Sequence, residues 1–446
     1  MKVKTLNIKQ KKTKKLYLDT LNYLYSRFPV FHQVGGVAYK PGLENTIKLL
    51  KSINNPHTRF KSIHIAGTNG KGSVSHMLAS VLQTAGYKVG LFTSPHLIYF
   101  GERIRVDGKM IEKQYVIDFV SYNKTLLEDI KPSFFELTMA MAFNYFADHN
   151  VEIAVIEVGL GGRLDSTNII KPELSVITNI SFDHVDLLGN TLEKIAIEKA
   201  GIIKPDTCVI IGESVPETKQ IFDAKAIQEN AEVVYAEEQL KVEFVAFNHE
   251  KMIVKTSDNK MFRVGLCGEY QLKNTATVLV VLQRLAKKGF IISEKQLESG
   301  LENVCEITGL MGRWQIIGQN PTIMADTCHN VAGVKEVIKQ LKKGNYGKLK
   351  IIIGFVRDKD ISKILEFLPM EAEYYYTQAS IPRALPVKLL EQKAKSINLS
   401  GKAYISVEQA VKSAISDSKE NDFIFIGGSN FIVGEALMYF QNNKQK

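Results

Sequence analysis

The stretch IHIAGTNGKGSVSHML, at residues 63–78, combines the residue types that bind phosphate. Its three glycines can adopt positive φ and leave backbone N–H groups free to converge on an anion. Lys71 can reach phosphate oxygens, and Ser73 can bind a phosphate oxygen or a metal ion. The helix expected from Ser73 onward directs the positive end of its dipole at the same point. The stretch therefore predicts a phosphate-binding turn between a strand and a helix.

The spacing of this turn differs from the common phosphate loop, G-x-x-x-x-G-K-[ST]. Ile65 occupies the first glycine position, and Gly72 separates Lys71 from Ser73. The alternative is an ordinary strand-to-helix turn. Three glycines with a lysine and a serine between a strand and a helix favour phosphate binding.

Further polar residues follow other apolar, strand-like segments. Glu157 ends the apolar run of IEVGLGGRLDSTN, Asp183 and His184 lie in TNISFDHVDLLG, and Ser94 and His96 lie in FTSPHL. Open α/β sheets bind ligands at the carboxyl ends of their strands. A carboxylate there is suited to a magnesium ion that bridges nucleotide phosphates. Each group alone could be a helix cap or a solvated turn, but three of them beside a phosphate turn favour a site.

Lys199, in IEKAGIIK, allows two interpretations. It could be a surface lysine whose stem lies along the helix, paired with Glu198 or Glu193. It could instead face Glu157, His184 and two magnesium ions, where an ammonium would be repelled. Only an anionic form, such as a carbamate, would fit that second position.

Strand-like and helix-like segments alternate along the chain. KVGLFTS, VEIAVIEVG, LSVITNI and TCVIIGE are strand-like, with helical segments such as FELTMAMAFNYFADH and NTLEKIAIEKAG between them. This alternation predicts a mostly parallel sheet covered by helices. Residues 232–265 differ, because EVVYA, VEFVAFN, MIVKT and FRVGL indicate an antiparallel flap or edge. GEYQLKNTATVLVVLQRLAKKG then returns to a helical pattern.

A second alternating block begins near Thr322 and contains TIMADT, LKIIIGF, YYYTQA, KAYIS and DFIFIGG. It predicts a smaller Rossmann-like domain, separated from the first near 306–313, where CEITGLMGRW breaks both periodicities. The predicted α/β fold thus has a basic N-terminal tail (1–16), a large phosphate-loop ATPase-type domain with a mostly parallel sheet (17–305) and a smaller Rossmann-like C-terminal domain (306–446). A nucleotide is expected in the cleft between the domains.

Composition restricts the possible partners. The first fifteen residues hold seven lysines and no acid, so only about +3 of the formal net charge of +10 belongs to the rest of the chain. A solvated, partly disordered tail explains this better than a nucleic-acid site, because no aromatic-interleaved basic patch accompanies it. The four cysteines lack zinc spacing, and no apolar run is long enough to span a membrane. We expect a cytoplasmic protein with reduced thiols, no nucleic-acid or membrane partner and a small polyanionic substrate.

Nine segments together resemble the dihydrofolate synthase/folylpolyglutamate synthase family of the Mur ligase superfamily. They are AGTNGKGS, TSPHL followed by GERI, EVGLGGRLDSTN, the DH of SFDHVDLLG, EKAGIIK, GEYQLKN, MGRW, DTCHN and GFVRDKD. They occur in the family's order and cover nearly the whole chain from about Tyr17. The unusual spacing of the phosphate loop is the form found in Mur ligases.

The resemblance implies three sets of site residues. ATP would contact Thr68, Asn69, Gly70, Lys71, Gly72, Ser73, Asn274, Arg313, Asp326 and His329. Two magnesium ions would be held by Ser94, Glu157, His184 and Lys199, the last as a carbamate. The pteroate pocket would be lined by Ser133, Phe134, Phe135, Glu136, Leu164, Asp165 and Ser166. The catalytic groups would be Lys71, Glu157, His184 and Lys199.

The implied activity is ATP-dependent ligation of L-glutamate to dihydropteroate and to folates through an acyl phosphate, by a protein expected to be a monomer. Three alternatives remain: a ligase restricted to folate polyglutamylation, a Mur ligase that builds peptidoglycan, and a nucleotide-switched binding protein. GLGGRLDSTN and TSPHL argue against the peptidoglycan ligase. A switch needs no acyl-phosphate site, so the retained set of Ser94, Glu157, His184 and Lys199 disfavours it.

The chain departs from the family pattern at three places. Tyr270 stands where the family often has histidine, and Val331 follows DTCHN where proline is common. SFFE, at residues 133–136, stands where a threonine often precedes the aromatic pair. None of these changes removes a charged catalytic group, but the last bears on pteroate selectivity.

Overall fold

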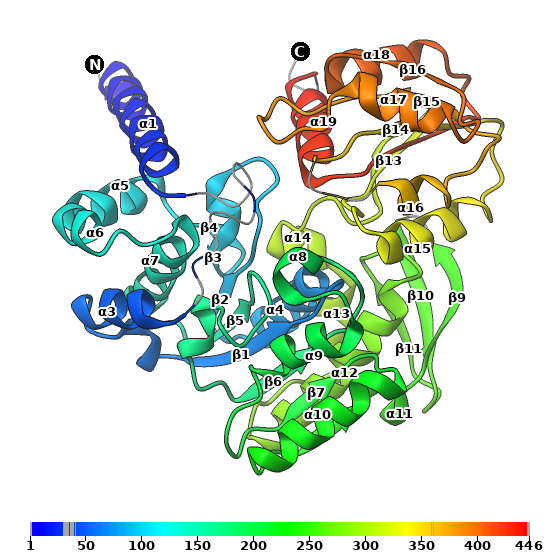
Figure 1. Cartoon of the computed structure of the whole chain (residues 1–446). Coiled ribbons are helices and arrows are strands. Elements are labelled where there is room, and N and C mark those ends of the chain that lie inside the picture. The colour runs from blue at the N-terminus through cyan, green and yellow to red at the C-terminus, as the bar shows by residue number, and fades with distance from the viewer. Residues whose placement is uncertain are drawn as a thin grey trace.

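The computed structural model describes residues 2–29 (the backbone alone for 2–10), 35, 40, 42–248, 250–357, 359 and 361–443. It contains two α/β domains, each built on its own sheet, and a small third sheet beside them (Figure 1). This arrangement confirms the predicted fold class.

The large sheet of the first domain has eight strands in the order β4-β3-β2-β5-β1-β6-β7-β8. All neighbouring pairs from β2 to β8 are parallel, while β3 and β4 form an antiparallel edge. The strands are β1 (Lys61–Ala66), β2 (Val89–Phe92), β3 (Ile104–Val106), β4 (Lys109–Met110), β5 (Ile153–Glu157), β6 (Leu174–Ile177), β7 (Val209–Ile211) and β8 (Val233–Tyr235).

Helices cover both faces of this sheet, as an alternating α/β chain requires. On β5, Ile153 and Val155 face the core beneath α4, and Ala154 and Ile156 face the core beneath α7. The helices of this domain are α1 (Lys2–Arg27), α3 (Glu44–Ser52), α4 (Lys71–Thr84), α5 (Lys113–Tyr122), α6 (Lys124–Ile130), α7 (Phe134–Asp148), α8 (Val185–Leu188), α9 (Leu192–Ala200), α10 (Pro216–Gln228), α11 (Ala236–Gln239), α12 (Gln271–Lys287), α13 (Glu294–Glu302) and α14 (Val304–Thr308). Short 3-10 turns occupy η2 (Pro56–Thr58), η3 (Phe100–Arg103) and η4 (Ser166–Ile169).

The predicted flap is confirmed in three of its four strands. β9 (Val242–Asn248), β10 (Lys251–Thr256) and β11 (Met261–Val264) form an antiparallel three-stranded sheet. The assignment of EVVYA to the flap is wrong, because β8 pairs in parallel with β7 at the edge of the large sheet. The crossover helix α10 precedes β8 and supplies the connection that a parallel strand needs.

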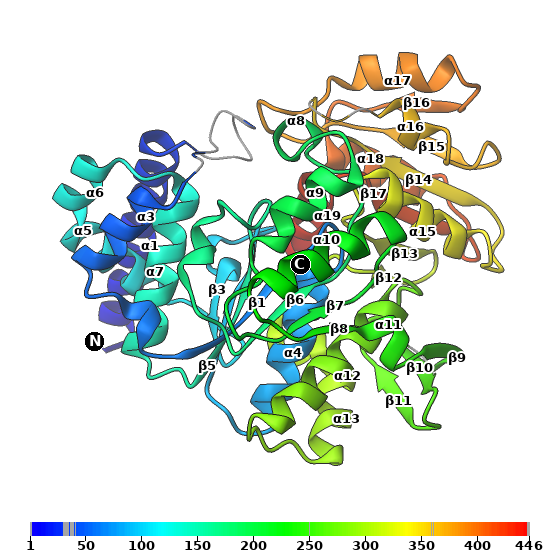
Figure 2. The same cartoon turned by 60° about the horizontal axis from the view of Figure 1, so that its bottom comes forward.

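The second domain has a six-stranded sheet in the order β12-β13-β17-β14-β15-β16, parallel except for β12. Its strands are β12 (Gln315–Gly318), β13 (Thr322–Ala325), β14 (Leu349–Ile353), β15 (Glu373–Tyr376), β16 (Gly401–Ala403) and β17 (Phe423–Gly427). Its helices are α15 (Val331–Leu341), α16 (Ser362–Leu365), α17 (Val387–Lys395), α18 (Val407–Ser416) and α19 (Asn430–Asn443). Figure 2 shows this domain above the carboxyl-end loops of the large sheet.

The chain differs from the prediction at its N-terminus and near the domain boundary. The predicted disordered tail is part of α1, which runs across residue 16 and projects from the body of the molecule (Figure 1). The lysines described on it, such as Lys12 and Lys15, are exposed as expected. The segment CEIT, expected to be irregular, is helical as α14. No helix among these described residues is long and apolar enough to span a bilayer, and all four cysteines are free thiols.

Candidate active site

The phosphate loop joins β1 to α4, as predicted. Gly67 and Gly70 have φ values of 145° and 85°, a region that L-residues with side chains avoid. A Cβ at Gly70 would lie 2.3 Å from Asn274 Oδ1, and one at Gly67 would lie 1.9 Å from Thr178 Oγ1. Backbone conformation and close packing therefore both require glycine. The helix begins at Lys71, two residues before the predicted start.

Two lysine amines meet on one carbonyl of this loop. Lys71 Nζ donates to the carbonyl oxygens of Gly67 and Thr68, at 2.9 and 3.2 Å. Lys199 Nζ also donates to the Gly67 carbonyl, at 2.9 Å, and the Lys199 residue is only 4% exposed. Burial, and next the charge of Lys71, lowers the pKa of Lys199 to about 7. The surface interpretation of Lys199 is therefore excluded, and Glu198 pairs with Arg163 instead, at 2.8 Å.

Glu157 ends β5, as predicted, and is buried. Its Oε2 accepts a hydrogen bond from the Ser94 backbone N–H, at 3.2 Å. Burial raises the pKa of this carboxyl, and Lys71, the Ser94 N–H group, Arg313 and Arg103 oppose that shift. The carboxylate is thus held beside cationic groups rather than beside solvent.

Asp183 and His184 lie six or more residues beyond the end of β6 at Ile177, so a loop rather than a strand end positions them. His184 has a φ of 50° and precedes the short helix α8. Burial lowers the pKa of His184 to about 4, which leaves a neutral ring able to bind a metal ion. Burial of Asp183 would raise its pKa, but His329, His184 and Lys359 hold the pKa of this carboxyl well below its usual range.

The family resemblance predicts that Ser94, Glu157, His184 and Lys199 hold metal ions. Over the described ranges, no three His, Cys, Asp or Glu side chains form a cluster that could hold a metal ion by themselves. All four predicted ligands line one cavity: the hydroxyl of Ser94, the carboxylate of Glu157, the neutral imidazole of His184 and the amine of Lys199, which was predicted to bind as a carbamate. This sparse set fits magnesium, which keeps several waters and takes further oxygens from phosphate groups.

The second domain contributes Arg313, Asp326 and His329 to the same cavity. A Cβ built on Gly72 would lie 3.7 Å from Arg313 Nη2 and 3.9 Å from Glu157 Oε2, so Arg313 reaches the phosphate loop. Asp326 directly follows β13 and is 3% exposed.

Tyr270, where the family often has histidine, holds Asp326 from the first domain. Its hydroxyl donates to Asp326 Oδ2 at 2.5 Å, and the Trp314 N–H group donates to the same oxygen at 2.8 Å. The Cys328 N–H group donates to Oδ1 at 2.8 Å. Asn274, on α12, lines the cavity and donates to Gln271 Oε1 at 2.7 Å.

A single cavity of about 1030 Å³ brings together nearly all the predicted site residues. From the sequence prediction it is lined by Thr68, Asn69, Gly70, Lys71, Gly72, Ser73, Ser94, Ser133, Phe134, Phe135, Glu157, Leu164, Asp165, Ser166, His184, Lys199, Asn274, Arg313, Asp326 and His329.

Glu136 is the exception. Its Oε2 accepts the Ser133 N–H bond at 2.6 Å, and its own N–H donates to Ser133 Oγ at 3.2 Å. This reciprocal pair caps the start of α7, and Glu136 is 1% exposed and does not line the cavity. The spacing S-x-x-E before an apolar helix is the sequence signature of such a cap.

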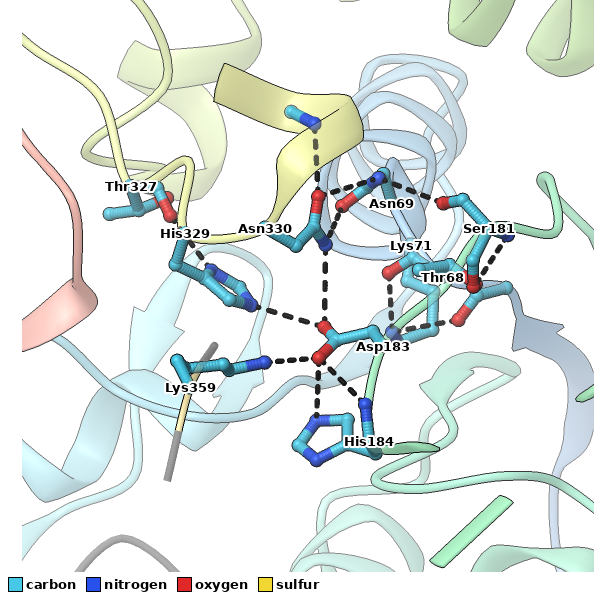
Figure 3. Close-up of polar contacts among 12 residues, drawn as sticks. Thr68, Asn69, Lys71, Ser181, Asp183, His184, Thr327, His329, Asn330 and Lys359 are labelled. Atoms are coloured by element: carbon cyan, nitrogen blue, oxygen red, sulfur yellow. Dashed lines mark hydrogen bonds and ion pairs between the residues drawn. The ribbon is translucent and has the colours of Figure 1, made fainter. Parts of the chain in front are cut away.

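Several residues of the site carry no role in the sequence prediction. Arg103 lines the cavity and donates to His96 Nδ1 at 2.8 Å, so His96 supports an arginine rather than facing the cavity itself. Asn330 and Lys359 reach Asp183 from the second domain (Figure 3). The segments GERI, DTCHN and GFVRDKD contain these residues, but only the three-dimensional contacts reveal what they touch.

This two-domain arrangement around a phosphate loop defines the Mur ligase class. Residues 65–282 match the Mur ligase middle domain, and residues 312–430 match the Mur ligase glutamate ligase domain. The chain is 32% identical over 439 residues to the dihydrofolate synthase/folylpolyglutamate synthase of Bacillus subtilis, covering 94% of this chain and 98% of that protein. It is 30% identical to the folylpolyglutamate synthase of Lacticaseibacillus casei, covering 92% and 96%. The chain belongs to the dihydrofolate synthase/folylpolyglutamate synthase family.

Solved structures agree with this assignment. Folylpolyglutamate synthase of Mycobacterium tuberculosis complexed with ADP superposes with a TM-score of 0.87 at 29% identity, covering 96% of this chain and 99% of that one. The Escherichia coli FolC protein in complex with DHPP and ADP gives a TM-score of 0.82 at 27% identity, covering 96% and 98%.

Proposed function

We propose that this protein uses ATP to join L-glutamate to dihydropteroate and to folates through an acyl phosphate. One observation carries this proposal: the phosphate loop, Glu157 and the predicted pteroate residues share a cavity with Arg313 and Asp326 of the second domain. The relatives support the substrate class. One has been solved with DHPP and ADP, and a bifunctional relative with Mn, AMPPNP and L-glutamate.

The chemistry explains why ATP is needed. A carboxylate does not react with an amine near neutral pH, because its oxygen is a poor leaving group. In the proposed reaction a carboxylate oxygen attacks the γ-phosphorus of ATP, the bond to the β-phosphate oxygen breaks, and ADP leaves. The α-amine of glutamate then attacks the acyl carbon, phosphate departs, and the amine loses a proton.

The side chains of this chain would act mainly through position and charge. Lys71 belongs to the phosphate loop and Arg313 reaches that loop from the second domain, so the two cations would offset the charge of the transferred phosphoryl group. Phe134 and Phe135 give the predicted pteroate end of the cavity an apolar lining, and a cleft closed by two domains would shield the acyl phosphate from water.

We further propose that Lys199 is carbamylated in the active enzyme. A neutral amine attacks carbon dioxide, an N–C bond forms and a proton is released. The burial of Lys199 favours the neutral amine that this step requires. Ser94, Glu157 and His184 would hold one magnesium ion and the carbamate a second, and the bound ions would neutralise phosphate charge.

A ligase restricted to polyglutamylation is the second candidate. The Lacticaseibacillus casei relative is called a folylpolyglutamate synthase alone, and SFFE at residues 133–136 departs from the family pattern beside the proposed pteroate pocket. We propose a cytoplasmic monomer in either case, in keeping with four free thiols.

Product analysis tests the proposal. The protein is incubated with ATP, magnesium and glutamate, and with either dihydropteroate or tetrahydrofolate, and the products are examined by mass spectrometry. Addition of one glutamyl residue to both acceptors supports the bifunctional assignment. Addition to tetrahydrofolate alone selects the restricted ligase, and addition to neither refutes both.

A further inference from the structure

A cluster of contacts joins the two domains through a carboxylate that has no role in the reaction proposed above (Figure 3). Its centre is the carboxylate of Asp183, whose side chain is 10% exposed. Lys359 forms an ion pair with it, His329 Nε2 lies 3.4 Å away, and Asn330 Nδ2 donates to it at 3.3 Å. All three partners belong to the second domain, and they follow β13 and β14.

The same cluster includes the phosphate loop. Asn330 Nδ2 donates to Asn69 Oδ1 at 2.9 Å, and Asn69 Nδ2 donates to Asn330 Oδ1 at 3.3 Å. Asn330 also caps the start of α15, where its Oδ1 accepts the Gly333 N–H bond at 2.9 Å. Asn69 is fixed on its own side by Asn179 Oδ1, which accepts its backbone N–H at 3.0 Å. The start of α15 is therefore joined to the turn that is expected to hold the phosphates.

The carboxylate of the cluster belongs to the first domain, and the ammonium that pairs with it belongs to the second domain. From the first domain, Asp183 receives the His184 backbone N–H, at 2.8 Å, and the His184 ring lies 3.9 Å away. The ammonium that offsets its charge is Lys359 of the second domain. A carboxylate shielded from water is strongly destabilised without a charged partner, and a charge-assisted hydrogen bond is stronger than a neutral one. The contact with Lys359 therefore favours the docked arrangement of the domains.

We propose that Asp183 is a positioning residue: its carboxylate docks the second domain on the phosphate loop and so brings Arg313 and Asp326 to the nucleotide. The docking depends only on the contacts described here, whereas its consequence for catalysis rests on the proposed function. Neither the docking nor its effect on catalysis requires Asp183 to touch a substrate.

Hydrogen–deuterium exchange of the full chain without nucleotide tests the docking. We compare the native protein with Asp183→Asn and with Asp186→Asn, an exposed carboxylate three residues further along the chain. In Asp183→Asn, exchange should become about tenfold faster at residues 67–71 and 328–333, and stay unchanged in β1 and β5. Asp186→Asn should match the native protein. Native exchange rates at both segments in Asp183→Asn would overturn the proposal.

A second pair of variants approaches the cluster from the other domain. Lys359→Met should reproduce the faster exchange, while Lys363→Met, at an exposed lysine, should not. If Asp183→Asn does not fold, this second pair still tests the proposal. Exchange rates in Lys359→Met equal to those of the native protein would then overturn it.

Kinetics separates positioning from a purely structural role. Asp183→Asn should lower kcat about tenfold or more at saturating ATP, whereas ADP binding, measured by equilibrium dialysis, should weaken by a smaller factor because the phosphate loop itself is retained. The double variant Asp183→Asn/Lys359→Met should be no slower than the slower single variant, because both remove one interaction. Multiplied losses would contradict the proposal. If the native protein has no ligase activity but still exchanges slowly at residues 67–71 and 328–333, the proposed function is refuted and the proposed docking role of Asp183 stands.

Discussion

The two sides of the cleft hold their charged groups by different means. On the first side, Lys71 and Lys199 donate to a main-chain carbonyl of the phosphate loop, and Glu157 accepts a main-chain N–H bond. On the second side, Asp326 accepts main-chain N–H bonds but also depends on the hydroxyl of Tyr270 in the first domain, and Lys359 pairs with Asp183 of the first domain, so side chains bind across the domain boundary. The first side is therefore built into one domain, whereas the second side is completed only when the domains dock.

The largest expected effect comes from the first side. Lys71→Ala should lower ligation by at least about 10²- to 10³-fold, because it removes the cation beside the transferring phosphoryl group. Circular dichroism and the melting temperature should stay close to those of the native protein. Lys109→Ala, at an exposed lysine of β4, is the matched control. Turnover near the native rate in Lys71→Ala would remove the phosphate loop from the mechanism.

Lys199→Ala should lose about 10²-fold in turnover, since it removes the group proposed to carry a carbamate. Formate or acetate should restore part of the activity by filling the vacated space with a carboxylate. The same acids should not rescue Lys71→Ala. An unmodified ammonium at Lys199 in a high-resolution map of the nucleotide-bound enzyme, prepared with bicarbonate, would contradict the proposal.

Acid should destabilise the first domain more than the second. His64 and His76 are buried there and hydrogen-bonded to threonine hydroxyls, and burial lowers the pKa of each to about 3. The unfolded chain binds their protons at a higher pH than the folded chain does, so the free energy of unfolding falls as pH drops from about 6.5 towards 3. Each histidine contributes up to about 1.4 kcal/mol per pH unit in this window.

Urea unfolding at pH 7 and pH 5 measures this difference. Trp314, the one tryptophan of the chain, packs against the core of the second domain and reports on it, while far-ultraviolet circular dichroism reports on both domains. The circular dichroism midpoint should fall more than the tryptophan midpoint at pH 5. Equal shifts of both midpoints would contradict the assignment of the acid response to the first domain.

The smallest expected effect lies at the domain boundary. Tyr270→Phe removes one hydrogen bond to Asp326, and such a bond contributes about 1 kcal/mol. We therefore expect the KM for ATP to rise roughly fivefold with little change in kcat. Tyr270→His, the residue common in the family, should recover most of the loss. A larger fall in kcat than rise in KM would show that Tyr270 acts on the chemical step.

How far the sequence predicts the structure also differs between the two sides. Glu157 and the phosphate loop could be predicted because periodicity reveals where a strand ends and a helix begins. The contacts of Asp183 and Asn69 with Lys359 and Asn330 could not, because they join residues far apart in sequence through the relative placement of two domains. The parallel pairing of β8 was also not predicted, because a strand of three apolar residues is compatible with both a parallel and an antiparallel sheet.

Lys199 and Glu136 show that sequence patterns also do not determine what a single side chain contacts. A lysine in a helix with apolar neighbours can lie on either face, and only the packed structure places Lys199 against the Gly67 carbonyl. The S-x-x-E spacing of residues 133–136 is typical of a helix cap, but the prediction for Glu136 followed the family resemblance alone and placed it in the pteroate pocket. The structure supports the cap.

Isotope transfer tests most directly whether the phosphate loop serves to activate a carboxylate. Dihydropteroate labelled with ¹⁸O in its carboxylate is incubated with ATP, magnesium, glutamate and the native enzyme, and the released phosphate is analysed by mass spectrometry. In an acyl-phosphate mechanism the attacking carboxylate oxygen leaves with the phosphate, so each turnover should transfer one labelled oxygen from a fully labelled carboxylate to phosphate. Unlabelled phosphate, released together with the glutamylated product, would contradict the account.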